Sequence, residues 1–116
     1  MSEYIPDKWE VVHLKFEDVD LHKVLASWYG GFAGADEWRL SSGIVSIVDH
    51  ENHYEIHNET GSVYQCHKKT QGTSGYTFGV FQKMAMELEE RGGSVVMCDI
   101  ANILDKYPPK SEPQIT

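Results

Sequence analysis

Apolar and polar positions alternate most clearly along residues 53–68, where two short segments flank a three-residue loop that ends in Gly61. Such a loop is typical of a β-hairpin whose last loop residue is left-handed. The register that it sets places Tyr54 opposite Cys66. One face is then apolar (Tyr54, Ile56, Tyr64, Cys66), and the other is polar apart from Val63 (His53, Glu55, His57, Gln65, His67). We predict a hairpin with one face buried, because a one-residue slip would mix the two faces.

Three other segments are rich in β-branched and aromatic residues and are typical of strands: residues 9–16, 38–49 and 94–99. Gly43 lies inside the second of them and indicates a bulge or a close approach by another segment. Residues 21–29 fit two interpretations. Helical spacing relates Leu21, Val24, Leu25 and Trp28, whereas a strand would place Val24, Ala26 and Trp28 on one face. The periodicity alone slightly favours the helix.

Residues 76–91 predict the one principal helix of the chain. Its apolar residues form a stripe at helical spacing: Phe78, Phe81, Met84, Ala85 and Leu88. Ser74 or Thr77 can cap the start of this helix, and Gly92-Gly93 is expected to end it. Residues 100–107 can add one further helical turn.

These elements together predict an α+β fold, with a mainly antiparallel sheet of about five strands and one amphipathic helix packed on one face. At 116 residues the chain is expected to form a single domain, with an ordered core over about residues 8–107. The lead-in of residues 1–7 is expected to be mobile, as is the tail of residues 108–116, which begins with two prolines.

The composition fits a globular protein, with 41% hydrophobic residues. No apolar run approaches the roughly 20 residues of a membrane helix, and the first residues lack the basic and apolar regions of a signal peptide. We therefore expect a cytoplasmic protein without membrane contact. In that reducing compartment Cys66 and Cys98 are expected to be free thiols.

The net charge of −8 comes from 18 acidic and 10 basic residues. It disfavours direct binding to nucleic acid, which needs a basic surface. It permits a basic protein partner, although moderate acidity also simply keeps a small protein in solution.

Catalytic motifs are not evident in the sequence, since no nucleophile, base and orienting group can be placed together. Cys66 and His67 are neighbours in a predicted strand, so their side chains point to opposite faces. The glycine-rich residues 30–34 lack the Lys-Ser/Thr that follows a phosphate-binding loop. We therefore expect no cofactor and favour a protein that is not an enzyme.

Six histidines are the most chemically distinctive feature of the composition. His53 and His67 face each other in the predicted hairpin and could share a metal ion, with His50 or Glu55 as a third ligand. Solvated imidazoles on an exposed sheet face are the favoured interpretation. A small metal-dependent enzyme or a metal-binding module that uses this face is the competing hypothesis.

Aromatic residues surround the glycine-rich loop and indicate a binding surface. Tyr29 and Phe32 lie beside glycines and are expected to be exposed, and with Arg39 they would form a recognition patch. Trp38 begins an apolar segment and is expected to be a core residue. A deep pocket beside Trp28 and Trp38 would instead favour a module that binds a small ligand.

Three segments carry a resemblance to a known group: K-V-L-A-S-W-Y-G-G-F (23–32), E-W-R-L-S-S-G-I (37–44) and G-S-V-Y-Q-C-H-K (61–68). With Thr77-Phe78-Gly79 they make about residues 8–90 similar to small uncharacterised proteins of tailed bacteriophages. The resemblance places residues 21–29 in a hairpin-like run, so we predict a strand there. It implies an accessory protein made in an infected bacterium, but no catalytic or ligand residues. We therefore predict a non-catalytic protein that binds a host or phage protein, and a role in host takeover or in inhibiting host defence fits this prediction.

Overall fold

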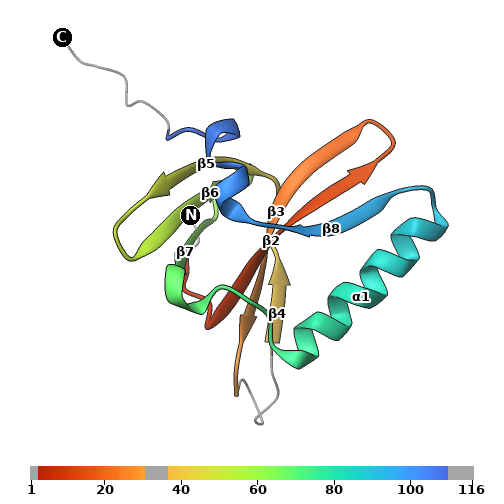
Figure 1. The fold of residues 1–116 in the computed structure, drawn as a ribbon, viewed down its shortest axis with the longest axis horizontal. Helices are drawn as coiled ribbons and strands as arrows, with labels where there is room; N and C mark the ends of the chain where they lie inside the picture. The colour runs from red at the N-terminus through yellow and green to blue at the C-terminus, as the bar shows by residue number, and fades with distance from the viewer. Residues whose placement is uncertain (1–2, 31–36, 110–116) are drawn as a thin grey trace.

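The structure is a computed structural model and describes residues 3–30 and 37–109. In these residues eight strands form two four-stranded sheets, and one α-helix, α1 (Gly75–Glu90), lies beside the second sheet (Figure 1). The first sheet has the strand order β1 (Glu3–Tyr4), β7 (Val63–His67), β6 (His53–Asn58), β5 (Ile44–Asp49). The second has the order β4 (Glu37–Leu40), β3 (Val19–Trp28), β2 (Lys8–Phe16), β8 (Ser94–Cys98). Three 3₁₀ turns complete the description: η2 (Lys68–Thr70), η3 (Ile100–Asn102) and η4 (Leu104–Lys106).

The predicted α+β class is confirmed, and so is the mainly antiparallel pairing. Of the strand pairs in the described residues, only β1 and β7 run parallel. The predicted number of about five strands in one sheet is too low, because the described residues form eight strands in two sheets. One missed strand is β1, which has two residues and lies in the expected lead-in. So short a segment shows no alternation from which a strand could be predicted.

The predicted long strand over residues 38–49 is wrong in its extent. β4 belongs to the second sheet and β5 to the first, and residues 41–43 cross between them. Ser41 ends β4, because its N–H donates to the Val24 carbonyl at 2.9 Å and its Oγ accepts from the Val24 N–H at 2.8 Å. The close approach predicted at Gly43 is confirmed, since a Cβ there would lie 3.0 Å from a carboxylate oxygen of Glu59.

The main core lies between the two sheets. Its buried residues come from both sheets and from the C-terminal turns: Trp9, Val11, Val24, Ala26, Ile44, Ile47, Ile56, Tyr64, Cys66, Ile100 and Ile103. Val12 and Leu25 lie on the opposite face of the second sheet and pack toward α1. β2 and β3 are therefore buried on both faces. The strand predicted over residues 21–29 is confirmed as part of β3.

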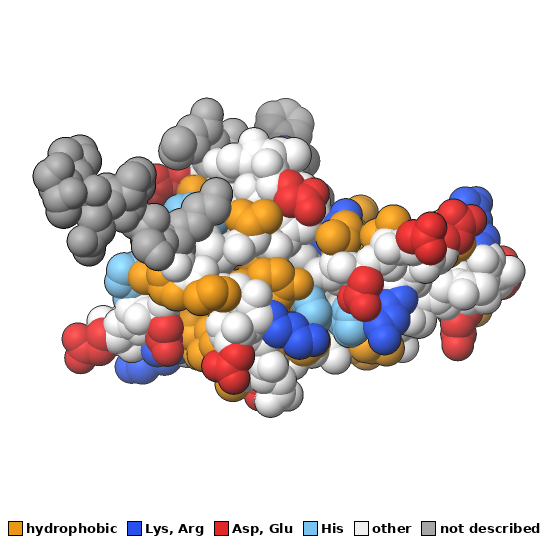
Figure 2. Space-filling view, turned by 90° about the horizontal axis from the view of Figure 1, so that it is seen from above, with side chains coloured by type: hydrophobic (Ala, Val, Ile, Leu, Met, Phe, Trp, Pro, Cys, Tyr) orange, Lys and Arg blue, Asp and Glu red, His pale blue; other side chains and the backbone are white. Residues whose placement is uncertain are grey.

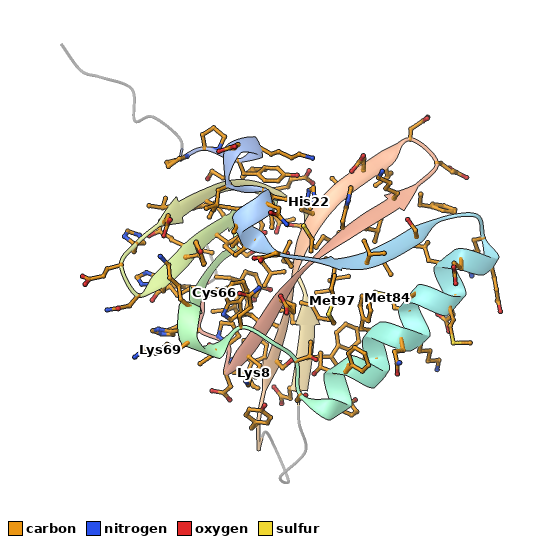
Figure 3. All side chains as sticks on the ribbon, in the orientation of Figure 1. Lys8, His22, Cys66, Lys69, Met84 and Met97 are labelled. Atoms are coloured by element: carbon orange, nitrogen blue, oxygen red, sulfur yellow. The ribbon has the colours of Figure 1, made fainter. Side chains whose placement is uncertain are left out.

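A second and thinner apolar layer joins α1 to the second sheet. Val12, Leu25 and Val95 are buried there, but the helix contributes only partly buried apolar side chains, namely Phe81, Met84, Ala85 and Leu88. Met84 of α1 and Met97 of β8 lie in the space between these elements (Figure 3). Phe78 is 42% exposed, so the buried stripe is narrower than predicted.

Each end of α1 lies one residue before the end of the predicted helix over 76–91. Ser74 is the N-cap, and its Oγ accepts from the Thr77 N–H at 3.1 Å. After Glu90 the chain turns through Gly92, and the Gly93 N–H donates to the Leu88 carbonyl at 2.9 Å. Within the part of the chain described, no helix has the length and apolar character to cross a membrane.

The hairpin of β6 and β7 has the predicted register, with Tyr54 opposite Cys66 and Ile56 opposite Tyr64. Its apolar face points into the main core, where the Cys66 side chain is fully buried between the sheets (Figure 3). Burial raises the pKa of the Cys66 thiol far above its usual value, so this side chain acts as a small hydrophobic residue.

Candidate functional site

Two adjoining cavities open where the edge strands of the two sheets, β1 and β4, approach each other. The larger, of about 520 Å³, is lined by Glu3, Tyr4, Ile5, Trp28, Glu37, Trp38 and Arg39, and we call it the aromatic cavity. The smaller, of about 320 Å³, is lined by Tyr4, Arg39, Leu40, Ser41, Ser42, Thr60, Ser62 and Tyr64, and we call it the hydroxyl cavity. Both are lined by Tyr4 and Arg39.

The parallel pairing of β1 with β7 places Tyr4 in the wall between the cavities. Tyr4 is the partner of Tyr64 in the sheet, and their rings stack with centroids 4.8 Å apart. The Trp28 ring lies 6.2 Å from the Tyr4 ring at an angle of 59°. Trp28 is held in place by a 3.0 Å hydrogen bond from its indole N–H to the Ile5 carbonyl. The aromatic wall is therefore formed before any ligand arrives.

Arg39 reaches the cavities from β4, where it pairs with Ala26 of β3. Its guanidinium carbon lies 4.8 Å from the centre of the Tyr4 ring, which is a cation–π contact. Among the residues described, Arg39 forms no ion pair with a carboxylate. A cation–π contact does not use the N–H groups of the guanidinium as hydrogen-bond donors to a carboxylate, so these groups can serve a ligand.

Tyr64 is 1% exposed and lines the hydroxyl cavity from β7. Within the described residues its phenol hydroxyl has no hydrogen-bond partner. Burial raises the pKa of the Tyr64 phenol to about 12, although the nearby Arg39 charge acts in the opposite direction. The phenol is therefore neutral near pH 7 and can donate a hydrogen bond.

The hydroxyl side chains of the smaller cavity come from two loops that are far apart in the sequence. Ser42 Oγ lies 3.0 Å from Thr60 Oγ1 and accepts from the Thr60 N–H at 3.2 Å. This contact joins the crossing segment between β4 and β5 to the loop of the β6–β7 hairpin. Ser62 Oγ accepts a 3.3 Å hydrogen bond from Asn58 Nδ2.

The residues predicted for a recognition patch have different outcomes. Arg39 lies at the cavities, and Tyr29 is 49% exposed at the end of β3. Phe32 lies outside the described residues. The expectation that Trp38 is a core residue is wrong, because it is 40% exposed and lines the aromatic cavity. Trp38 lies on the same face of β4 as Leu40, which packs in the helix layer, but β4 is the outermost strand of its sheet and Trp38 stays outside that layer.

Sequence reasoning missed the contributions of Tyr4 and Tyr64. The first lies in the segment expected to be a loose lead-in, and the second was assigned to the core alone. A cavity lies beside Trp28 and Trp38, but it is open rather than the deep pocket that would favour a small ligand. No local sequence signal indicates that Tyr4 and Arg39 complete it.

On the polar face of the β6–β7 hairpin His53 lies opposite His67, as predicted. The rings of His53 and His67 lie 5.9 Å apart, and the rings of His50 and His53 stack at 4.6 Å. Glu55 binds two imidazoles, with His50 Nε2 at 3.1 Å and His57 Nε2 at 2.5 Å. These hydrogen bonds lower the pKa of Glu55. Among the described residues, no group of three or more His, Cys, Asp or Glu side chains is arranged to hold a metal ion.

Charged side chains of both signs are interspersed over the face that Figure 2 shows, rather than gathered by sign. Such a distribution lacks the basic patch or stripe that contacts nucleic acid. The expectation that the protein does not bind nucleic acid directly, which was drawn from the net charge, stays a prediction.

Comparisons with known proteins found no family model, no curated protein and no solved structure that matches this chain.

Proposed function

We propose that this chain is a non-catalytic accessory protein of the phage type, which binds a partner protein through the aromatic and hydroxyl cavities. The observation that carries this proposal is the cluster of Tyr4, Trp28, Trp38 and Arg39 around an open cavity of about 520 Å³. Trp, Tyr and Arg are the residue types that most often anchor protein interfaces. In this proposal the protein acts in the cytoplasm of an infected bacterium.

A protein partner fits the charge of the molecule better than nucleic acid does. With a net charge of −8 the chain repels a polyanion at long range. Two adjoining cavities with aromatic and polar walls suit successive side chains of a bound segment. Arg39 contacts both, so it is the expected anchor of the interface.

The test is capture of partners by the immobilised protein from bacteria infected by a tailed phage, followed by quantitative mass spectrometry. The decisive variant is Tyr29→Ala with Trp38→Ala. Trp38 lines the aromatic cavity, Tyr29 directly follows Trp28 of that cavity in the chain, and both side chains are exposed, so their loss leaves the core intact. We expect recovery of the specific partner to fall at least about tenfold, as is usual when interface anchors are removed.

The matched control is Tyr76→Ala with Met86→Ala, which removes two exposed apolar side chains from α1. It should recover the same partners as the unchanged protein. If both double variants behave alike, or if the unchanged protein recovers no specific partner, the proposed function is wrong.

A small-ligand module is the second candidate, and one observation favours it. The aromatic cavity lies beside Trp28 and Trp38 and has the volume of a small-molecule site. Native mass spectrometry of the protein from infected cells separates the two candidates. A bound small molecule that the Trp38→Ala variant lacks would support the ligand module.

A further inference from the structure

We propose that the hydroxyl cavity is an oxyanion subsite, in which Arg39 and Tyr64 bind a phosphate monoester or carboxylate group of the partner. This inference names the chemistry of one part of the ligand and rests on the proposed function. It follows from the charges and hydrogen-bond donors that line the cavity.

Arg39 supplies the positive charge of the subsite. It is the one charged side chain among the residues that line the hydroxyl cavity. Its guanidinium carbon lies 4.8 Å from the centre of the Tyr4 ring, and among the described residues it has no carboxylate partner. The Tyr4 contact restricts the guanidinium, and no carboxylate of the described residues occupies its N–H groups, so these groups can bind phosphate or carboxylate with two parallel hydrogen bonds.

Tyr64 supplies a neutral donor at the same cavity. Its side chain is 99% covered by the protein, yet its hydroxyl has no hydrogen-bond partner within the described residues. Among the described residues the fully buried side-chain polar atoms without a partner are Ser27 Oγ and Asn58 Oδ1. The Tyr64 hydroxyl instead opens onto the cavity, where it can donate a hydrogen bond to a ligand. An oxyanion beside Arg39 would accept this hydrogen bond.

Ser62 supplies a third donor. Its Oγ accepts from Asn58 Nδ2 at 3.3 Å, and its own proton has no acceptor in the part of the chain described. Three donors of different kinds therefore line one cavity, whereas none of its side chains is a carboxylate. The lining thus suits an anion and disfavours a cation.

The acidity of the whole chain does not oppose a single bound oxyanion. Surface charges are screened beyond about 8 Å at physiological ionic strength, so contacts inside the cavity decide the binding. The net charge of −8 acts against a polyanion, which would bring many charges close to the surface.

The adjoining aromatic cavity indicates what carries the oxyanion. Tyr4 and Arg39 line both cavities, so a group that joins an aromatic ring to an oxyanion can fill both at once. A phosphorylated or carboxylate-bearing side chain has this chemistry. Phenyl phosphate and benzoate are therefore suitable probes, and benzyl alcohol is the neutral control.

The experiment is a titration of the ¹⁵N-labelled protein with each probe, followed by amide chemical shifts. We expect phenyl phosphate or benzoate to bind at least about tenfold more tightly than benzyl alcohol, with shifts at β1, β4 and β7. Arg39→Gln should lower the affinity for the anionic probe at least about tenfold. Tyr64→Phe should lower it about threefold or more. Arg91→Gln, on the far end of the helix, is the matched control and should bind as the unchanged protein does.

Preference for phenyl phosphate would identify a phosphate monoester as the source, and preference for benzoate a carboxylate. The inference is overturned if benzyl alcohol binds as well as the anions, or if Arg39→Gln and Arg91→Gln give the same affinity. Arg39 is exposed, so its variant should keep the spectrum of the folded protein even if Tyr64→Phe does not. Loss of partner capture in the Tyr29/Trp38 variant without anion binding would retain the proposed function and reject only the oxyanion subsite.

Discussion

His22 shows at the scale of one residue how the two sheets are tied together. It is 4% exposed, and its Nδ1 lies 2.7 Å from the Tyr107 hydroxyl. The Tyr107 carbonyl in turn accepts from the Ile47 N–H of β5 at 2.9 Å. Tyr107 therefore joins β3 of the second sheet to β5 of the first. Figure 3 shows His22 beside the C-terminal turns.

The titration of His22 predicts a loss of stability in mild acid. Burial, with the nearby charges of His13 and Lys106, lowers the pKa of His22 below its ordinary value of 6.5. Between the folded pKa and about 6.5 the unfolded chain binds a proton that the folded protein does not. The contribution of His22 is thus present above about pH 6.5 and is lost as the pH falls toward the folded pKa.

Thermal unfolding of His22→Gln between about pH 7.5 and about pH 5.5 tests this prediction. The melting temperature of the variant should fall less across this range than that of the unchanged protein, because glutamine does not titrate. His67→Gln is the control, since His67 is exposed. Equal slopes for the unchanged protein and His22→Gln would contradict the prediction.

At the scale of elements, two glycines near α1 should respond in opposite ways to the same substitution. A Cβ at Gly79, inside the helix, would meet no atom within 4 Å. A Cβ at Gly93 would lie 2.7 Å from the Lys15 carbonyl oxygen and 2.9 Å from Leu88. Gly79→Ala should therefore raise the free energy of unfolding by about 0.5–1 kcal/mol, whereas Gly93→Ala should lower it by about 1–3 kcal/mol.

Urea denaturation of the two variants measures both changes against the unchanged protein. Each glycine serves as the control for the other, because the added methyl group is the same. A lower free energy of unfolding for Gly79→Ala would contradict the prediction, because the higher helix propensity of alanine would then not decide the stability at position 79.

The sequence predicted those elements whose pattern is complete within a short segment. The β6–β7 hairpin could be predicted to its register, because the loop at Gly61 and the alternation agree. β3 was ambiguous for a physical reason. Val24 faces the main core and Leu25 faces the helix, so a strand buried on both sides loses its alternation.

The break between β4 and β5 could not be predicted in the same way. Residues 38–49 keep the composition of a strand throughout, and the switch between sheets depends on Ser41 bonding to the backbone of β3. Such a contact between distant segments leaves no periodic signal. The exposure of Trp38 follows from the same break, because it leaves β4 as a short edge strand.

At the scale of the whole molecule, the candidate site is lined by residues from segments that are far apart in the sequence. Sequence reasoning therefore found only parts of it. Arg39 and the tryptophans could be proposed from residue type alone. Tyr4 and Tyr64 become neighbours only through the parallel pairing of β1 with β7, across about sixty residues of chain. The local pattern around Tyr4 contains nothing that predicts this pairing.

The two apolar layers of the molecule should differ in local stability. The main core holds eleven buried residues from both sheets and the C-terminal turns. The helix layer holds three, and within α1 only Thr77 is buried. Opening of α1 therefore exposes few fully buried side chains and leaves the core between the sheets in place. Such thinly packed elements open at lower free energy than the whole domain.

Native-state hydrogen exchange tests this difference across the molecule. Amide protons near Phe81 in α1 should exchange with an opening free energy at least about 1 kcal/mol below those of Val11 in β2 and Ile56 in β6. The reason is that the helix can detach by separating partly buried side chains, whereas β2 and β6 can exchange only when the main core opens. Gly79→Ala should slow exchange in α1 without affecting β6. Equal protection of α1 and the central strands would mean that the helix layer unfolds only together with the two sheets.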